Sequence, residues 1–359
     1  MAAASPATQR SWLRALTDLP TASGKEHSVQ KWVRRWAGAR GLHVFEDRAG
    51  NLLVRSAKRS RRRPLVAVAH MDHPALVVKS IAPQVEAELR GGVASEYLAG
   101  ARLRIETKSG PIPARVEGLD SEVVVLGGRL DGVGPGDIAR WHFAESALGV
   151  GGDRLRARAC DDLAGAAASL SALDRLVASG LSHFSVLLTR AEEVGFVGAI
   201  AACELKTLAL GTRVLSIECS RQSVDAPVGG GPIVRVGDAS SVFSAELTNR
   251  VTEVVRSTGL PHLRKLMSGG SCEATAFAAF GYESTGLCLA LDNYHNMVDL
   301  DGVRSGKRRA RLAPEEISLS DFSGLVNLLE ALAVGLDSRK PTLPRRLRAL
   351  YRDGRKILV

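Results

Sequence analysis

Apolar residues near the start of the chain change from a helical to a strand-like spacing. The capping-box pattern Ser23-Gly24-Lys25-Glu26 precedes an amphipathic stretch, which predicts a helix running to about Ala39. The apolar residues at helical spacing are Val29, Trp32, Val33 and Trp36. Strands are predicted next, at residues 51–55 and 64–69. The second is continuously apolar, as expected of a strand covered by helices on both faces, and it leads directly into His70-Met71-Asp72.

Beyond this point the pattern changes twice. From about Val77 to Arg156, short β-like runs are broken by glycines, which indicates a small β domain. These runs are residues 85–89, 101–107, 112–119 and 122–127. Helical and strand-like stretches then alternate again. The predicted helices are 162–179, 198–205, 241–257, one after Ser271 and 321–336, and the predicted strands are 183–190, 212–219 and 285–291. The sequence therefore predicts an α/β fold with a small inserted β domain.

Composition narrows the class of protein. A length of 359 residues fits one large domain with a smaller one. The five cysteines are widely spaced and include no CxxC pair, which argues against a disulfide framework or a thiolate zinc site and favours reduced thiols. No apolar run reaches the roughly 18 residues of a membrane span, and the start of the chain lacks a secretory pattern. We therefore expect a cytoplasmic protein with no membrane partner.

The net charge of +10 raises the question of nucleic-acid binding. The basic residues concentrate in residues 58–63 and in the tail from Arg339 to Lys356. Neither stretch is interleaved with the aromatic residues of a stacking surface. We interpret them as a solvated loop and a solvated tail, so nucleic acid is not the expected partner.

Residues of metal-binding type lie at or just after the ends of predicted strands. They are His70-Met71-Asp72, Asp161-Asp162, Glu192-Glu193, Glu218 and His295. Each alone is more often incidental, since a Glu pair is usually a solvated face and Asp161-Asp162 could simply cap the following helix. Together they provide the carboxylate and imidazole ligands of a two-metal site, at the edge where an α/β sheet presents its ligands.

The spacing inside two of these motifs indicates separate roles. His70 and Asp72 point to the same side if strand geometry continues, so Asp72 can orient the imidazole and leave one ring nitrogen free for a metal. Adjacent side chains diverge at Glu192-Glu193, so one carboxylate can bind metal while the other handles protons.

These motifs resemble the tetrahedral, or deblocking, aminopeptidases, a family of two-zinc metallopeptidases that includes glutamyl aminopeptidases. The matching phrases follow the family's order over nearly the whole chain. They are residues 19–24 with Glu26, 47–52, 69–72, 159–162 with Gly165, 192–195 with Gly198-Ala199, and 294–296. The β domain lies between His70 and Asp161, as in this family, whereas related deacylases and dipeptidases carry their extra domain after the Glu pair.

The resemblance implies a three-layer α/β/α metallopeptidase domain with a mixed central sheet, formed by residues 1–76 and 157–340. It implies an inserted β-barrel-like oligomerisation domain at 77–156 and leaves a basic tail at 341–359. It also implies a homo-oligomeric aminopeptidase that hydrolyses N-terminal residues of peptides. The cofactors would be two divalent metal ions, zinc before cobalt or manganese.

The resemblance also assigns individual roles. His70, Asp161 and Glu218 would hold one ion, and Asp161, Glu193 and His295 the other, so that Asp161 bridges them. Glu192 would be the general base toward a bridging metal-bound water, and Asp72 would orient His70. The peptide bond between Asp161 and Asp162 is expected to be cis, as it is in this family.

Three departures from the family pattern lie near the substrate end. His73-Pro74-Ala75 replaces an acidic residue and a small apolar pair, Leu163 replaces an arginine, and Gly269-Gly270-Ser271-Cys272-Glu273 replaces Gly-Gly-Thr-Asp. Substrate preference therefore stays open. Two alternative functions also stay open: an amidohydrolase of deacylase or carboxypeptidase type using the same metals, and a catalytically silent relative acting as a binding protein.

Overall fold

An eight-stranded sheet forms the centre of the computed structural model, which describes residues 2–120, 123–337 and 342–358. The strand order is β1-β2-β12-β3-β13-β16-β14-β15. The strands are β1 (His43–Glu46), β2 (Leu52–Arg55), β3 (Leu65–His70), β12 (Phe184–Thr189), β13 (Arg213–Arg221), β14 (Ile233–Gly237), β15 (Leu263–Leu266) and β16 (Glu283–Leu291). Neighbours from β12 to β16 run parallel, whereas β2 and β14 pair antiparallel with β12 and β16. The sheet is mixed, as the resemblance implied.

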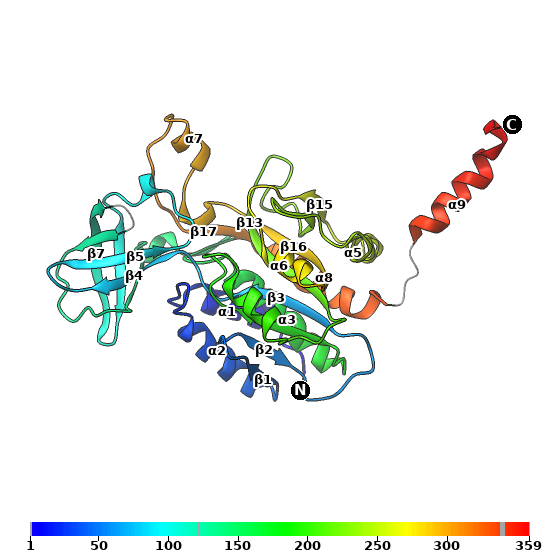
Figure 1. The fold of residues 1–359 in the computed structure, drawn as a ribbon, viewed down its shortest axis with the longest axis horizontal. Coiled ribbons are helices and arrows are strands. Elements are labelled where there is room, and N and C mark those ends of the chain that lie inside the picture. Colours follow the sequence, from blue (N-terminus) through cyan, green and yellow to red (C-terminus); the bar gives the residue numbers. More distant parts are fainter. Residues whose placement is uncertain (1, 121–122, 338–341, 359) are drawn as a thin grey trace.

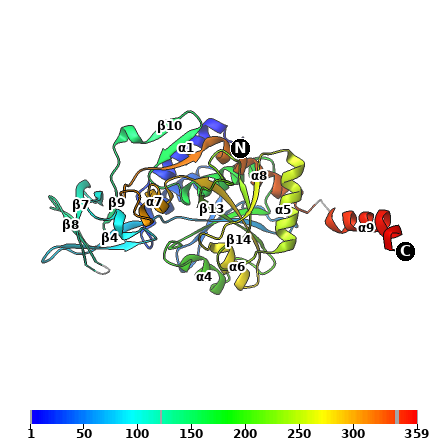
Figure 2. The same cartoon turned by 90° about the horizontal axis from the view of Figure 1, so that it is seen from above.

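Helices cover both faces of this sheet (Figures 1 and 2). One face carries α1 (Pro6–Thr17), α2 (His27–Gly38), α3 (Leu163–Ala178), α5 (Ala245–Thr258) and α8 (Leu319–Gly335), and the other carries α4 (Val197–Glu204) and α6 (Glu273–Ala279). In β3, Leu65, Ala67 and Ala69 pack toward the first set of helices, whereas Val66 and Val68 pack toward the second. Both sides of the strand are therefore apolar, and the predicted three-layer α/β/α fold is confirmed.

A closed barrel is inserted between β3 and α3, at the left of Figure 1. Its strands are β4 (Ala75–Ser80), β5 (Val85–Arg90), β6 (Arg102–Thr107), β7 (Gly110–Asp120), β8 (Val123–Gly127) and β9 (Ile138–Trp141), in the order β4-β5-β8-β7-β6-β9. It has a core of its own, which includes Leu76, Leu103, Ile105 and Trp141. This confirms an inserted small β domain.

A second, three-stranded sheet follows the barrel. Its strands are β10 (Gly149–Gly151), β11 (Arg154–Ala157) and β17 (Glu315–Ser318). The chain from 149 to 156, which the sequence pattern groups with the insertion, thus pairs with the end of the α/β domain instead. Short helical segments complete the fold: η1 (Ser95–Tyr97), η2 (Glu145–Ala147), η3 (Tyr294–Asn296) and α7 (Leu300–Arg304).

The capping box predicted ahead of α2 does not form. The Ser23 hydroxyl donates to Asp72 Oδ2 at 2.6 Å, and the Glu26 carboxylate accepts from the backbone N–H groups of Gly24 and Ala191. Helix α2 begins without a side-chain cap. The capping interpretation was wrong because these two side chains connect the segment to loops at the sheet edge.

The described part of the basic C-terminal segment, residues 342–358, is helical, which the sequence pattern had not indicated, and Arg339 and Lys340 lie outside the described residues. Helix α9 (Thr342–Gly354) is followed by η4 (Arg355–Leu358), and both extend away from the body (Figure 1). Within the three described stretches of chain, no helix is both long enough and apolar enough to cross a membrane. All five cysteines are free and buried.

Candidate metal centre

The five predicted ligand residues converge at the carboxyl ends of the central strands. His70 ends β3, Asp161 precedes α3, Glu193 follows β12, Glu218 lies in β13 and His295 follows β16. Asp161 lies between the two histidines, because its Oδ1 is 3.5 Å from His70 Nε2 and its Oδ2 is 3.6 Å from His295 Nε2. One carboxylate thus presents one oxygen to each half of the site.

A second carboxylate belongs to each half. Ligand atoms of His70, Asp161 and Glu218 lie within 4.8 Å of one another, and so do those of Asp161, Glu193 and His295. Glu193 Oε1 is 3.2 Å from His295 Nε2. Two ligands that each bind a tetrahedral zinc ion at about 2.1 Å lie about 3.4 Å apart. The observed separations therefore suit a cation between the ligands.

Several buried polar atoms here have no hydrogen-bond partner among the described residues. They are Asp161 Oδ1, Glu193 Oε1, Glu218 Oε1, His295 Nε2 and both carboxylate oxygens of Asp162 and of Glu273. Buried carboxylates without donors or counter-ions are costly. Because carboxylates outnumber cationic groups at this place, the site fits divalent cations. Imidazole and carboxylate are ligands that zinc accepts.

Both histidines are oriented by carbonyl oxygens. His295 Nδ1 is 2.7 Å from the carbonyl oxygen of Gly92, and its ring stacks on Tyr294 with centroids 3.8 Å apart. His70 Nδ1 is 3.1 Å from the carbonyl oxygen of Asp72. Each Nδ1 therefore carries the proton and donates it, so Nε2 is free to bind a metal. Gly92 follows β5, so the barrel side of the chain helps to build the site.

The Asp72 carboxylate holds the Glu192-Glu193 turn more closely than it holds His70. Its Oδ1 is 3.6 Å from His70 Nδ1, whereas the carboxylate accepts from the backbone N–H groups of Glu192 at 3.0 Å and Glu193 at 3.1 Å. Burial opposes ionisation, but the neighbouring His70 and the hydrogen bonds from Ser23 and the Glu192 backbone outweigh it and lower the pKa of Asp72. This carboxylate fixes the directions in which the two glutamates diverge.

Glu192 faces the same centre. Its Oε2 is 3.9 Å from His70 Nε2, and its side chain is buried. Burial raises the pKa of Glu192 well above its ordinary value, and the negative charges of Glu218 and Glu193 add to the effect while His70 opposes it. A carboxylate with a raised pKa is suited to accept and return a proton.

Glu315, which sequence reasoning missed, joins the two halves of the centre. Its carboxylate accepts backbone hydrogen bonds from Cys160 at 2.6 Å, Asp161 at 3.1 Å and His295 at 2.9 Å. It thereby fixes the backbone of a residue from each ligand group. The residue lies in β17 with no ligand-like motif around it, so the sequence offered no signal.

His73 was noted only as a departure from the family pattern, and it also lies beneath the centre. Its Nδ1 is 2.8 Å from the carbonyl oxygen of Asp161, and its Nε2 is 3.1 Å from Asn296 Oδ1. The Asn296 amide donates to the carbonyl groups of Arg158 and Ala313, which keeps its oxygen toward His73. Both ring nitrogens thus face oxygen atoms, and His73 connects the backbone of Asp161 to the side chain of Asn296.

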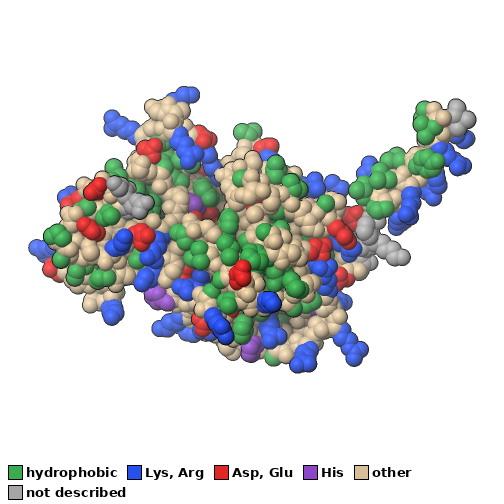
Figure 3. Space-filling model, in the orientation of Figure 1, with side chains coloured by type: hydrophobic (Ala, Val, Ile, Leu, Met, Phe, Trp, Pro, Cys, Tyr) green, Lys and Arg blue, Asp and Glu red, His purple; other side chains and the backbone are tan. Residues whose placement is uncertain are grey.

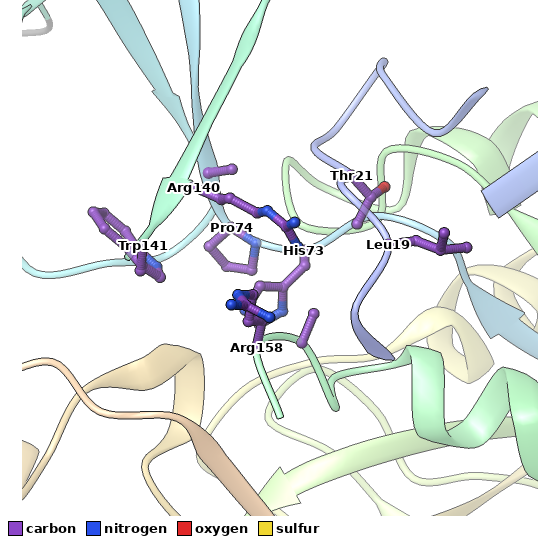
Figure 4. A pocket seen from close by; sticks show the side chains of 9 residues that line it. Leu19, Thr21, His73, Pro74, Arg140, Trp141 and Arg158 are labelled. Carbon is purple, nitrogen blue, oxygen red and sulfur yellow. The ribbon is translucent and has the colours of Figure 1, made fainter. Parts of the chain in front are cut away.

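A small pocket lies behind His73, where the barrel meets the α/β domain (Figure 4). Arg140 and Trp141 of β9 line it from the barrel side, and Arg158 lines it from the segment that leads to Asp161. Its volume of about 10 Å³ holds about one water molecule. It is a packing gap behind the centre and not a substrate cleft.

Two further buried acidic residues, Asp162 and Glu273, lie near the centre. Asp162 stands ahead of α3, but its side chain makes no capping hydrogen bond, so the capping explanation of Asp161-Asp162 is wrong. The peptide bond between them is cis, as the resemblance implied.

Glu273 is fully buried, and burial raises its pKa to about 7. Its signal in the sequence was the departure from Gly-Gly-Thr-Asp, which was assigned to the substrate end.

Comparisons with known proteins find similar peptidases. The M42 glutamyl aminopeptidase family model matches residues 130–308. A putative aminopeptidase of Acetivibrio thermocellus is 23% identical over 328 residues, which cover 85% of this chain and 97% of the relative.

Solved structures share the fold. The TET1 peptidase of Pyrococcus horikoshii is 22% identical with a TM-score of 0.74, and the match covers 90% of this chain and 99% of that one. A TET aminopeptidase of Thaumarchaeota archaeon SCGC AB-539-E09 is 20% identical with a TM-score of 0.75, covering 91% and 96%. The family match, the curated relative and the shared fold agree with one another, and all three show that the chain is similar to the M42 glutamyl aminopeptidases.

Proposed function

We propose that this protein is an aminopeptidase that uses two divalent metal ions to remove N-terminal residues from peptides. The observation that carries the proposal is the position of the Asp161 carboxylate, with one oxygen toward His70 and the other toward His295. His70, Asp161 and Glu218 would hold one ion, and Asp161, Glu193 and His295 the other. Zinc suits these ligands, and cobalt or manganese are the alternatives.

When bound, two such ions activate a water molecule, polarise the scissile carbonyl and hold the free amino group of the substrate. Glu192 takes the proton from the attacking water and returns it to the leaving amine, a role that its raised pKa favours. Asp72 keeps the backbone of Glu192 and Glu193 in place, so that the two carboxylates keep different directions and different tasks.

Homo-oligomerisation through the barrel is part of this proposal. The TET1 peptidase of similar fold is described as assembling into a tetrahedron or a large octahedral shell. The barrel projects from the α/β domain (Figure 1), and a small β domain gains stability from a partner. A strictly monomeric mass in solution with metal present would count against it.

The proposal is tested by assaying one preparation for bound metal and for hydrolysis of paired substrates. Aminoacyl amides and their N-acylated counterparts differ only in the free amino group. We expect metal-dependent hydrolysis of the free-amino series alone. Preference for the acylated series would instead indicate the deacylase alternative, and metal binding without turnover of either series would indicate a silent binding protein.

A further inference from the structure

Helix α9 has an apolar face and a basic face, and both are in solvent. Leu343, Leu347 and Leu350 recur at spacings of four and three residues and share one face. Their exposed fractions are 49%, 55% and 58%, and Tyr351 beside them is 63% exposed. The opposite face carries basic residues, namely Arg345, Arg348 and Arg352. A row of exposed leucines on one helix face favours contact with another apolar surface.

The other basic segment of the chain lies at the same end of the molecule. The Ser182 hydroxyl donates to the Arg59 carbonyl, and the neighbouring His183 contacts the Ala333 carbonyl of α8 at 2.9 Å. Asp337, just beyond α8, pairs with Arg213 at 2.7 Å. The loop 58–63 is therefore close to the end of α8.

The start of α9 cannot lie far from this place. Five residue steps separate Asp337 from Thr342, and an extended chain covers about 18 Å in that length. Figure 3 shows Lys and Arg side chains on α9 and along the lower right edge of the body. Within the described chain, four cations of the loop pair with no carboxylate: Lys58, Arg59, Arg61 and Arg62. The loop 58–63 and α9 are distant in sequence, but both thus lie at the same end of the molecule.

We propose that this end of the protein docks on an anionic phospholipid surface. In this arrangement α9 lies along the interface with its leucines inserted, and its arginines reach the headgroups while the loop 58–63 adds electrostatic attraction. The proposal revises the expectation of no membrane partner, because that expectation considered only spanning segments and α9 is peripheral.

Charge and apolar surface together select this partner. The segment 342–358 has six basic residues and one acidic residue, a net charge of +5, so the rest of the chain retains the other half of its total of +10. The body of a second copy therefore offers no net charge that complements this end. Nucleic acid matches the charge, but it offers no apolar surface to the leucine face, which carries a single tyrosine as its aromatic residue.

The test is co-sedimentation of the full-length protein with vesicles of phosphatidylcholine, either pure or mixed with phosphatidylglycerol. We expect binding to the mixed vesicles only, weakened by salt. The double variant L347Q/L350Q keeps the charge and should bind about tenfold or more weakly. R59Q/R61Q/R62Q should also bind more weakly. As a control, R129Q removes one positive charge in the connection between β8 and β9 and should bind like the parent protein.

Three outcomes would overturn the proposal. They are the absence of vesicle binding, equal binding of L347Q/L350Q and the parent protein, and binding to a single-stranded RNA probe that mixed vesicles fail to compete. Circular dichroism of each variant separates a lost contact from a lost fold. Peptidase activity does not enter the readout, so the result is independent of the proposed function.

Discussion

Glu192 and Asp161 both place a carboxylate at the centre, but their surroundings indicate different chemical roles. Asp161 lies between two histidines, whereas Glu192 lies beside His70 at 3.9 Å. We expect E192Q to keep its metal and to lose about 10²- to 10⁴-fold in turnover, because a base is removed and no ligand is lost. D161N should lose metal. Metal analysis alongside turnover of a free-amino substrate checks both variants.

Equal metal loss in the two variants would show that the roles are assigned wrongly. Glu193→Gln is the matched control, because it changes the adjacent carboxylate and should weaken metal binding as D161N does.

At the level of single residues, the sequence pointed to the ligands and missed their supports. His70 and Glu193 could be found because they follow predicted strands whose ends meet at one sheet edge, and Asp161 because it stands directly before a predicted helix. The contacts of Glu315 and Asn296 could not be found, because a backbone amide that needs an acceptor, or a backbone carbonyl that needs a donor, leaves no trace in residue types. These contacts form only when segments that are distant in sequence pack together in the folded chain.

At the level of elements, α4 approaches the end of β12 so closely that only glycine fits at 198. A Cβ there would overlap the backbone N and O of Arg190 and lie 2.7 Å from Asn51 Oδ1. The Gly198 N–H donates to the Arg190 carbonyl at 2.8 Å, so the backbone is not free to shift. We expect G198A to destabilise the protein by about 1–3 kcal/mol.

The control is G38A in α2, where an added Cβ meets no atom within 4 Å. That variant should be neutral or stabilising by about 0.5–1 kcal/mol. Urea unfolding of both variants measures the difference. A G198A protein as stable as G38A would contradict the close approach of α4 to β12.

Elements with both sides buried were the easiest to predict. β3 is a continuous apolar run up to His70 and β13 is buried over most of its length, and their predicted bounds agree closely with the structure. β9 and α1 were missed, because β9 is short and α1 has polar residues over much of its length. The capping box does not form because its side chains bind residues that are distant in sequence. Ser23 donates to Asp72, and Glu26 accepts from the backbone of Ala191.

At the level of the whole molecule, metal removal should make stability depend on pH. Burial raises the pKa of Glu218 to about 8 and that of Glu273 to about 7, from 4.5. The metal-free folded state then binds more protons than the unfolded state from about pH 4.5 up to about pH 8, so its stability falls as pH rises through this window. Asp72 has a lowered pKa, is ionised in both states there and does not contribute.

We therefore expect the melting temperature of chelator-treated protein to fall between pH 6 and about pH 8. Zinc should remove much of this fall, because a bound cation favours the ionised carboxylates. Thermal unfolding of treated and zinc-reloaded protein across the range measures both effects. A metal-free protein that becomes more stable toward pH 8 would contradict the carboxylate surplus.

The domain plan was predictable, but the contact between domains was not. A change from helical to glycine-broken β texture located the insertion between His70 and Asp161. Nothing in that texture indicates that the Gly92 carbonyl orients His295 from the barrel side. The site therefore depends on how the two parts pack.

The central claim is that one carboxylate, Asp161, serves two metal ions. Anomalous X-ray scattering at the zinc edge, from crystals grown with zinc, tests it most directly. We predict two peaks about 3.5 Å apart, one near His70 and Glu218 and the other near Glu193 and His295, with an Asp161 oxygen at each. A single peak, or zinc bound without Asp161 between the ions, would contradict the account.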